Sequence, residues 1–114
     1  MPSCLFCQIV AGNVDADIVR TGELTLAFRD IKPQAPVHLL IIPKEHLRSV
    51  AELSDEHGEL LVEMARMAQW IAASEGVAES GYRLVANTGP DGGQTVDHLH
   101  FHLLGGRQMT WPPG

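Results

Sequence analysis

Three histidines alternate with apolar residues near the C-terminal end of the chain. His98, His100 and His102 are separated by Leu99 and Phe101, and half of the six histidines of the chain lie in this run. In a β-strand this alternation places three imidazoles on one face and the apolar side chains on the other, where they pack into a core. The spacing suits direct metal binding, or nucleophilic catalysis by one imidazole whose neighbours set its tautomer and supply protons. A surface histidine cluster is the third interpretation.

The segment just before these histidines is polar and rich in glycine. Residues 87–95 read NTGPDGGQT. Main-chain N–H groups at the glycines, the amide of Asn87 and the hydroxyl of Thr95 are donors suited to phosphate oxygens. Hairpins also need glycines, but the position directly before the histidines favours phosphorus chemistry.

The two cysteines lie close together at the start of the chain. Cys4 and Cys7 form a Cys-x-x-Cys pair, which is too closely spaced to staple a fold. In a reducing compartment such a pair is typical of redox activity or metal binding.

The elements that must position these residues follow from the hydrophobic periodicity. It predicts a short helix over Cys4–Ala11 and a long helix that starts at the N-cap Ser54 and ends at Gly76. Strands are predicted over Ile18–Thr21, Leu24–Phe28, Val37–Ile42, Tyr82–Ala86 and Val96–Leu104. The fold class is therefore α+β with a mostly antiparallel five-stranded sheet, the long helix on one face and the histidines on the other.

Length and charge limit the function classes. A chain of 114 residues is expected to form a single domain over residues 1–114 with one core. The net charge of −6 argues against non-specific nucleic-acid binding. No apolar run approaches the ~20 residues of a membrane span, and the start MPSC lacks the features of a signal peptide. We therefore expect a cytoplasmic protein with no nucleic-acid or membrane partner.

The histidine run resembles a known signature. Residues 98–104, HLHFHLL, match three histidines that alternate with apolar residues and are followed by two more. Other segments are similar to the Hint branch of the histidine triad (HIT) superfamily, namely FRDI (28–31), PQAPVH (33–38), IPK (42–44), DGGQ (91–94), LGGRQM (104–109) and WPPG (111–114). The resemblance spans nearly the whole chain, and the C-terminal segments make it highly specific.

The resemblance implies a HIT fold and a homodimer in which two protomers form one continuous sheet. It also implies a hydrolase that cleaves the P–N bond of purine nucleoside phosphoramidates, in which AMP or a similar nucleotide is linked to an amine. By motif position His100 is the nucleophile that forms a nucleotidyl-histidine intermediate. His102 and His38 flank the phosphate and assist proton transfer. No organic cofactor is implied.

The resemblance also assigns substrate-binding residues. Asp30 is expected at the ribose hydroxyls, although a loop carboxylate that caps Lys32 is the ordinary alternative. The expected phosphate and base contacts are Asn87, Gly93, Gln94 and Thr95 for the phosphate, and Phe28, Arg29, Ile31, Ile9 and Ile18 for the base. Phe28 and the isoleucines could equally be ordinary core. Trp111, in the proline-rich tail, is expected to reach the partner subunit's site.

A structural zinc is the expected inorganic component. Other histidine triad proteins carry a Cys-x-x-Cys pair whose thiolates join two histidines around zinc, and the matching ligands here are Cys4, Cys7, His46 and His98. Two cysteines and two histidines make a closed tetrahedral site. The alternative is a reduced pair without metal, with Cys7 packed in the N-terminal helix.

Three other functions stay open on the sequence. One is a nucleotide-binding regulatory or interaction protein with little hydrolysis. Another is a dinucleoside polyphosphate hydrolase or a transferase. The last is a metal-dependent hydrolase with zinc held by His98, His100 and His102 together.

Overall fold

The computed structural model describes residues 3–114; Met1 and Pro2, which begin the stretch expected to lack a leader, lie outside the described residues. Two α-helices, α1 (Leu5–Val10) and α2 (Gly58–Ser74), are accompanied by two 3₁₀ turns, η1 (Val50–Glu52) and η2 (Asp55–His57). The strands are β1 (Ile18–Thr21), β2 (Thr25–Arg29), β3 (Val37–Pro43), β4 (Tyr82–Val85) and β5 (Phe101–Gly105). No helix within residues 3–114 is long and apolar enough to cross a membrane.

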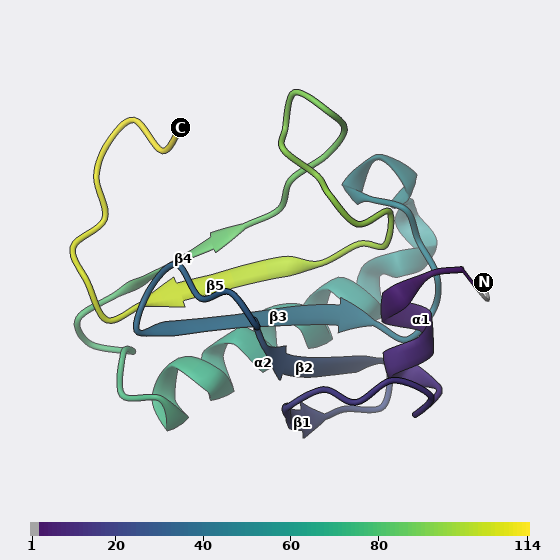
Figure 1. Cartoon of the computed structure of the whole chain (residues 1–114), viewed down its shortest axis with the longest axis horizontal. Helices are drawn as coiled ribbons and strands as arrows, with labels where there is room; N and C mark the ends of the chain where they lie inside the picture. The colour runs from purple at the N-terminus through teal and green to yellow at the C-terminus, as the bar shows by residue number, and fades with distance from the viewer. Residues whose placement is uncertain (1–2) are drawn as a thin grey trace.

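The strands form one antiparallel sheet in the order β1-β2-β3-β5-β4, so the last strand lies between β3 and β4 (Figure 1). This confirms the predicted α+β class and five-stranded antiparallel sheet. The register pairs Leu40 with His102 and His38 with Leu104. Residues opposite each other, and residues two apart on one strand, share a face. His38 and His102 therefore lie on the same face of the sheet.

The two faces of the sheet carry separate apolar clusters. Buried residues of α2, among them Met64 and Ile71, pack with Leu39, Leu99 and Leu103 on one face. On the opposite face a second cluster joins α1 to β2 and β3 through Phe6, Ile9, Leu26, Phe28, Leu40 and Ile42. Figure 1 shows α2 running behind the sheet, with α1 at the end where β3 finishes. His38 and His102 therefore lie on the face opposite α2, as predicted, and α1 packs on that same face.

The long helix begins later than predicted. The Ser54 side chain accepts the N–H of Glu56, and the Ser54 N–H donates to Nδ1 of His57 at 2.9 Å. These contacts close the 3₁₀ turn η2, and α-helical geometry starts only at Gly58. The predicted stop is confirmed, because Gly76 follows the C-cap with a φ of 76° that favours glycine.

The predicted histidine strand is wrong in its first half. Ladder pairing ends where Ile41 faces Phe101, so residues 96–100 lie outside β5. The main chain finds other partners there: the N–H of Leu99 donates to the carbonyl of Leu47, and Pro43 at the end of β3 has its carbonyl bonded to the His98 ring. Of the three histidines only His102 is on the strand.

Candidate active site

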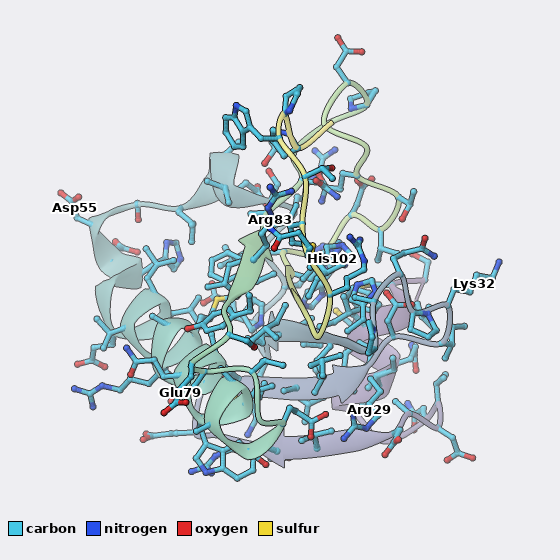
Figure 2. The ribbon with its side chains drawn as sticks, turned by 90° about the vertical axis from the view of Figure 1, so that its left-hand side faces the viewer. Arg29, Lys32, Asp55, Glu79, Arg83 and His102 are labelled. Atoms are coloured by element: carbon cyan, nitrogen blue, oxygen red, sulfur yellow. The ribbon has the colours of Figure 1, made fainter. Side chains whose placement is uncertain are left out.

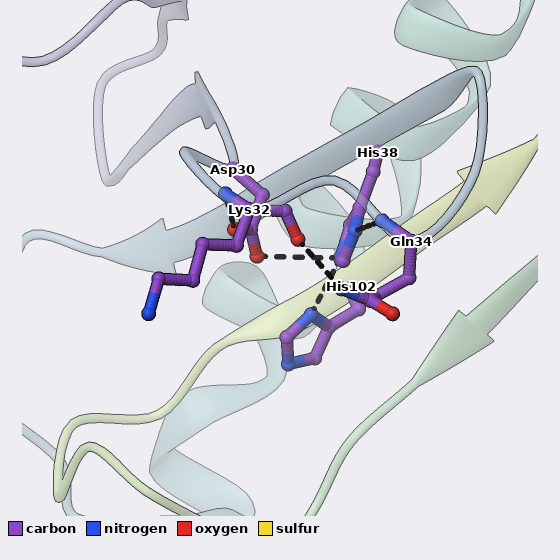
Figure 3. A network of polar contacts seen from close by, with 5 residues as sticks. All are labelled: Asp30, Lys32, Gln34, His38 and His102. Atoms are coloured by element: carbon purple, nitrogen blue, oxygen red, sulfur yellow. Dashed lines mark hydrogen bonds and ion pairs between the residues drawn. The ribbon is translucent and has the colours of Figure 1, made fainter.

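Two histidines from neighbouring strands, His38 on β3 and His102 on β5, are joined by a hydrogen bond between their rings. Nε2 of His38 lies 2.9 Å from Nδ1 of His102, and the main-chain N–H of Gln34 donates to Nδ1 of His38 at 3.0 Å (Figure 3). A main-chain N–H can only donate, so Nδ1 of His38 is an acceptor and its proton is on Nε2. That N–H donates to Nδ1 of His102, and the remaining proton of His102 is therefore on Nε2.

His100 is fixed in the opposite tautomer by its own main chain. Its Nδ1 lies 2.7 Å from the carbonyl oxygen of His98. A carbonyl can only accept, so Nδ1 carries the proton and Nε2 keeps a free lone pair. The rings of His100 and His102 are adjacent, with centroids 4.9 Å apart. One imidazole thus offers a nucleophilic nitrogen beside another that offers a proton.

The surroundings favour neutral imidazoles. Burial lowers the pKa of His38, and the Asp30 carboxylate, 3.4 Å away, opposes this effect only in part. Burial, with smaller contributions from the neighbouring imidazoles of His100 and His38, lowers the pKa of His102 to about 4. Both rings are therefore neutral near pH 7, as the tautomers above require.

A cavity of about 410 Å³ opens beside these rings. His100 and His102 line it together with Thr95 from the loop before them. The residues predicted to bind ribose and base that also line it are Asp30, Phe28, Arg29, Ile31 and Ile9. The structure thus gathers most of the predicted base and ribose residues around the two histidines.

Two of these lining residues already have partners. One Asp30 oxygen accepts the main-chain N–H of Lys32 at 2.8 Å, which is the turn contact considered as the ordinary alternative. The guanidinium of Arg29 makes paired contacts of 2.7 and 3.1 Å with Glu75 and lies 3.6 Å from Asp17. The second Asp30 oxygen faces His38.

The other predicted substrate residues lie outside the cavity lining. Ile18 is on the edge strand β1 and is half exposed, and Trp111 is exposed in the tail. Asn87 and Gly93 lie in the loop between β4 and β5. Gln94 braces that loop, because its side chain bonds to the N–H of Gly89 and to the carbonyls of Arg48 and Val96.

Sequence reasoning missed several residues of the site. The N–H of Gln34 orients His38 through the main chain, which no side-chain motif reveals. Phe6 lines the cavity and contacts the His100 ring, and its position inside the Cys-x-x-Cys pair is the only signal that could have found it. Lys32 also lines the cavity, and Figure 2 shows its side chain extending outward from the molecule.

A second group of potential ligands lies at the other end of the histidine run. Cys4, Cys7, His46 and His98 bring their Sγ and Nδ1 atoms within 4.8 Å of one another. Individual distances are 3.3 Å for Cys4–His98, 3.2 Å for Cys7–His46, 3.6 Å for Cys7–His98 and 3.2 Å between the two histidines. We call these four residues the thiol–imidazole cluster.

This cluster separates His98 from the other two histidines. Nδ1 of His98 faces the cysteines, and Nε2 of His98 donates to the carbonyl of Pro43 at 2.9 Å. His100, in contrast, has its Nδ1 engaged by the His98 carbonyl. The three imidazoles do not converge on one point, which gives the three-histidine zinc hydrolase no geometric support.

Comparisons with known proteins agree with this geometry. The family model of the HIT domain matches residues 11–109, and the chain belongs to the HIT family. The chain is 49% identical over 105 residues to the purine nucleoside phosphoramidase of Escherichia coli, covering 92% of this chain and 88% of that protein. It is 48% identical over 112 residues to the 14 kDa zinc-binding protein of Zea mays, covering 96% and 87%. A crystal structure of a HIT family hydrolase from Legionella pneumophila superposes with a TM-score of 0.96 at 54% identity, covering 98% of this chain and 100% of that one.

Proposed function

We propose that this protein hydrolyses the P–N bond of purine nucleoside phosphoramidates, with His100 as the nucleophile. The observation that carries the proposal is the pair of opposite tautomers at one cavity: a lone pair on Nε2 of His100 and a proton on Nε2 of His102. The name of the 49% identical relative, a purine nucleoside phosphoramidase, supports the same chemistry.

In the first step Nε2 of His100 attacks the α-phosphorus while the P–N bond breaks. The leaving amine takes a proton from Nε2 of His102, and the N–H of His38, which donates to Nδ1 of His102, stabilises the negative charge left on that ring. A proton is needed here because an amine anion is a poor leaving group, and a positioned acid of this kind contributes about 10²–10⁴-fold in rate. The proton on Nδ1 of His100 stays bonded to the His98 carbonyl, which stabilises the positive charge that the ring acquires.

In the second step water attacks the phosphorus and the P–N bond to His100 breaks. The proton that the water loses passes to His102, which has just given one up, so the enzyme returns to its initial state. The products are the nucleoside monophosphate and the free amine. Splitting the reaction in this way replaces one difficult displacement with two easier ones.

The cavity lining supports a nucleoside as the group held beside the phosphorus. The apolar wall formed by Phe28, Ile9 and Ile31 suits a purine ring, and the carboxylate of Asp30 suits two adjacent ribose hydroxyls. Asp30 can accept ribose hydroxyls while it keeps the N–H of Lys32, because a carboxylate offers about four acceptor sites. Thr95 of the lining, with Asn87 from the same loop, is assigned to the phosphate. Gly93 and Gln94 would have to exchange contacts first, because their main-chain N–H groups and the Gln94 amide already donate within the protein.

We also propose that the thiol–imidazole cluster holds a structural zinc ion. Zinc–nitrogen distances of about 2.0–2.1 Å and zinc–sulfur distances of about 2.3 Å at tetrahedral angles place neighbouring ligand atoms about 3.3–3.8 Å apart. Four of the six distances in the cluster are 3.2–3.6 Å, and all six are within 4.8 Å. The bond from Nε2 of His98 to the carbonyl of Pro43 leaves the Nδ1 lone pair for a metal. When bound, the ion would act as a cross-link between α1, the segment after β3 and the histidine run.

We further propose the homodimer with a continuous sheet, formed through β4. This strand is an edge of the sheet and, within residues 3–114, pairs only with β5, and Leu84 on it is 43% exposed. An unpaired edge that carries an exposed leucine is a template for pairing with another chain. The exposed tail residue Trp111 would then be available to a neighbouring subunit.

The function is tested by incubating the protein with adenosine phosphoramidate or a fluorescent tryptamine phosphoramidate. Wild-type protein is expected to release the amine, and His100→Ala to lose about 10⁴-fold or more of turnover, as expected for loss of a nucleophile. The control His57→Gln removes a histidine on η2, outside the cavity, and should retain wild-type turnover. Equal turnover by His100→Ala would refute the nucleophile. Nucleotide binding without turnover by wild-type protein would favour the interaction-protein alternative, and nucleotide transfer without hydrolysis would favour a transferase.

A further inference from the structure

Phe6 connects the thiol–imidazole cluster to His100. Its side chain is only 4% exposed, and its ring meets the His98 ring at a centroid distance of 5.8 Å and the His100 ring at 5.2 Å, both edge to face. A third edge-to-face contact, at 5.4 Å, joins it to Phe28 of the cavity wall. One buried aromatic ring therefore contacts a cluster histidine, the proposed nucleophile and the base pocket.

The cysteines hold Phe6 in that position from both sides along the chain. Cys4 caps α1, because its Sγ accepts the N–H of Cys7 at 3.3 Å. The same Sγ lies 3.3 Å from His98, and Sγ of Cys7 lies 3.2 Å from His46. Helix α1, which contains Phe6 and Cys7, has only six residues. A helix of that length is too short to be stable alone. Its place on the sheet therefore depends on the cluster and on the packing of Phe6 and Ile9.

The orientation of the His100 ring needs such a support. The bond from Nδ1 to the His98 carbonyl fixes the tautomer and one edge of the ring. It leaves the ring free to tilt about that bond, and tilting moves Nε2 away from the line of attack on phosphorus. The Phe6 edge, at an interplanar angle of 90°, limits that motion from the side of α1.

We propose that Phe6 is a positioning residue for His100, through which the thiol–imidazole cluster controls the orientation of the reactive imidazole. Cys4, Cys7, His46 and His98 hold α1, α1 holds Phe6, and Phe6 holds the His100 ring. The catalytic part of this inference rests on the proposed function, whereas the control of ring motion stands on the contacts alone.

The test compares two phenylalanine-to-leucine variants by nuclear magnetic resonance of ¹³C,¹⁵N-labelled histidines. Phe6→Leu removes the contact with the His100 ring. Phe101→Leu is the matched control, because Phe101 follows His100 directly but packs in the apolar cluster with α2, on the other face of the sheet. In Phe6→Leu the His100 ring should keep its Nδ1–H tautomer, become more mobile on the nanosecond-to-millisecond scale, and lose about tenfold to a hundredfold in kcat with a smaller change in KM. In Phe101→Leu the ring motion and kcat should match the wild type. Ring motion and kcat in Phe6→Leu that equal those of Phe101→Leu would overturn the proposal.

A second arm addresses the cluster. Adding one equivalent of zinc to metal-free wild-type protein should slow amide hydrogen exchange in α1 and reduce His100 ring motion, whereas Phe6→Leu should show the slower exchange without the change in ring motion. A reduction in ring motion that persists in Phe6→Leu would contradict the role of Phe6. Phe6→Met, which nearly conserves volume, replaces the leucine variant if that one fails to fold, with the same expected increase in ring motion. If wild-type protein cleaves no phosphoramidate, the proposed function is refuted. The comparison of His100 ring motion in the variants then still tests the positioning role of Phe6.

Discussion

The carbonyl of His98 accepts the Nδ1 proton of His100 at 2.7 Å. His98 thereby contributes to both sites, because its ring faces Cys4 and its main-chain carbonyl sets the tautomer of the proposed nucleophile. The alternation of the histidine run puts the rings of His98 and His100 on the same side, and the break in pairing before β5 lets each ring take a different partner.

His102 is expected to act mainly on the leaving group. His102→Ala should lower turnover of an alkylamine phosphoramidate by about 10²–10⁴-fold, because the variant cannot protonate the departing amine. The loss should shrink when the leaving group is a weakly basic aromatic amine that needs less protonation. Measuring kcat across a series of leaving amines checks this, and a loss that is the same for every amine would show that His102 has another role.

Acid is expected to weaken the fold between about pH 6.5 and about pH 4. The pKa of His102 falls from 6.5 to about 4 on folding because the ring is buried beside other imidazoles. Between those values the unfolded chain binds the additional proton, so the free energy of unfolding decreases as pH falls, by up to about 1.4 kcal/mol per pH unit for this group. Urea unfolding at pH 7 and pH 5 measures the slope. His102→Gln should reduce the slope, and equal slopes in wild-type protein and His102→Gln would exclude this origin.

Purified protein is expected to contain one zinc ion per chain, because four neutral or thiolate ligands stand at suitable distances. Cys7→Ser should lower the zinc content and the melting temperature together, since structural zinc contributes to folding. Elemental analysis without prior chelator treatment measures the content. Wild-type protein that carries only traces of zinc would count against the site.

Glu63 is expected to stabilise the β1–β2 hairpin. Its carboxylate accepts the N–H of Leu24 at 2.9 Å and the hydroxyl of Thr25 at 2.5 Å, and Thr25 is fully buried. Glu63→Ala leaves these donors without their partner and should cost about 1–3 kcal/mol in the free energy of unfolding. Gln69→Ala, at an exposed position of the same helix, is the control and should change it by less than about 0.5 kcal/mol. Similar losses in the two variants would mean that the carboxylate contacts contribute little.

The proposed dimer makes a prediction about strand edges. Leu84→Lys on β4 should yield monomers in light scattering, because a lysine on an edge strand opposes pairing with another chain. Ile18→Lys places the same charge on the opposite edge strand and should leave the dimer intact. A dimer that survives the first change, or is lost through the second, would place the interface elsewhere.

The sequence predicted the architecture well because hydrophobic period and turn residues act locally. Each predicted strand from Ile18 to Ala86 agrees with the structure to within one residue at either end. The error at Val96–Leu104 has a non-local cause: whether His98 pairs in a ladder depends on Pro43 and Cys4, which are distant in sequence. Apolar alternation continues through Leu99 even where pairing stops, so the pattern alone could not locate the start of β5.

The candidate site was predictable to the extent that its residues carry their own chemistry. The three histidines of the run 98–102, His38 and the cysteine pair are reactive side chains, and their types and spacing can be read from the sequence. The contributions of Gln34 and the His98 carbonyl come from the main chain, and that of Phe6 from an apolar ring in a short helix. Such contributions depend on tertiary packing, which residue type does not encode.

The most direct test of the account is to stop the reaction of wild-type protein with a phosphoramidate within milliseconds and to locate any bound nucleotide by peptide mass spectrometry. Nucleophilic catalysis by His100 predicts a nucleoside monophosphate attached to the peptide that contains His100, and no such adduct in His100→Ala. A nucleotide found on another residue, or turnover with no adduct at any time point, would contradict nucleophilic catalysis by His100.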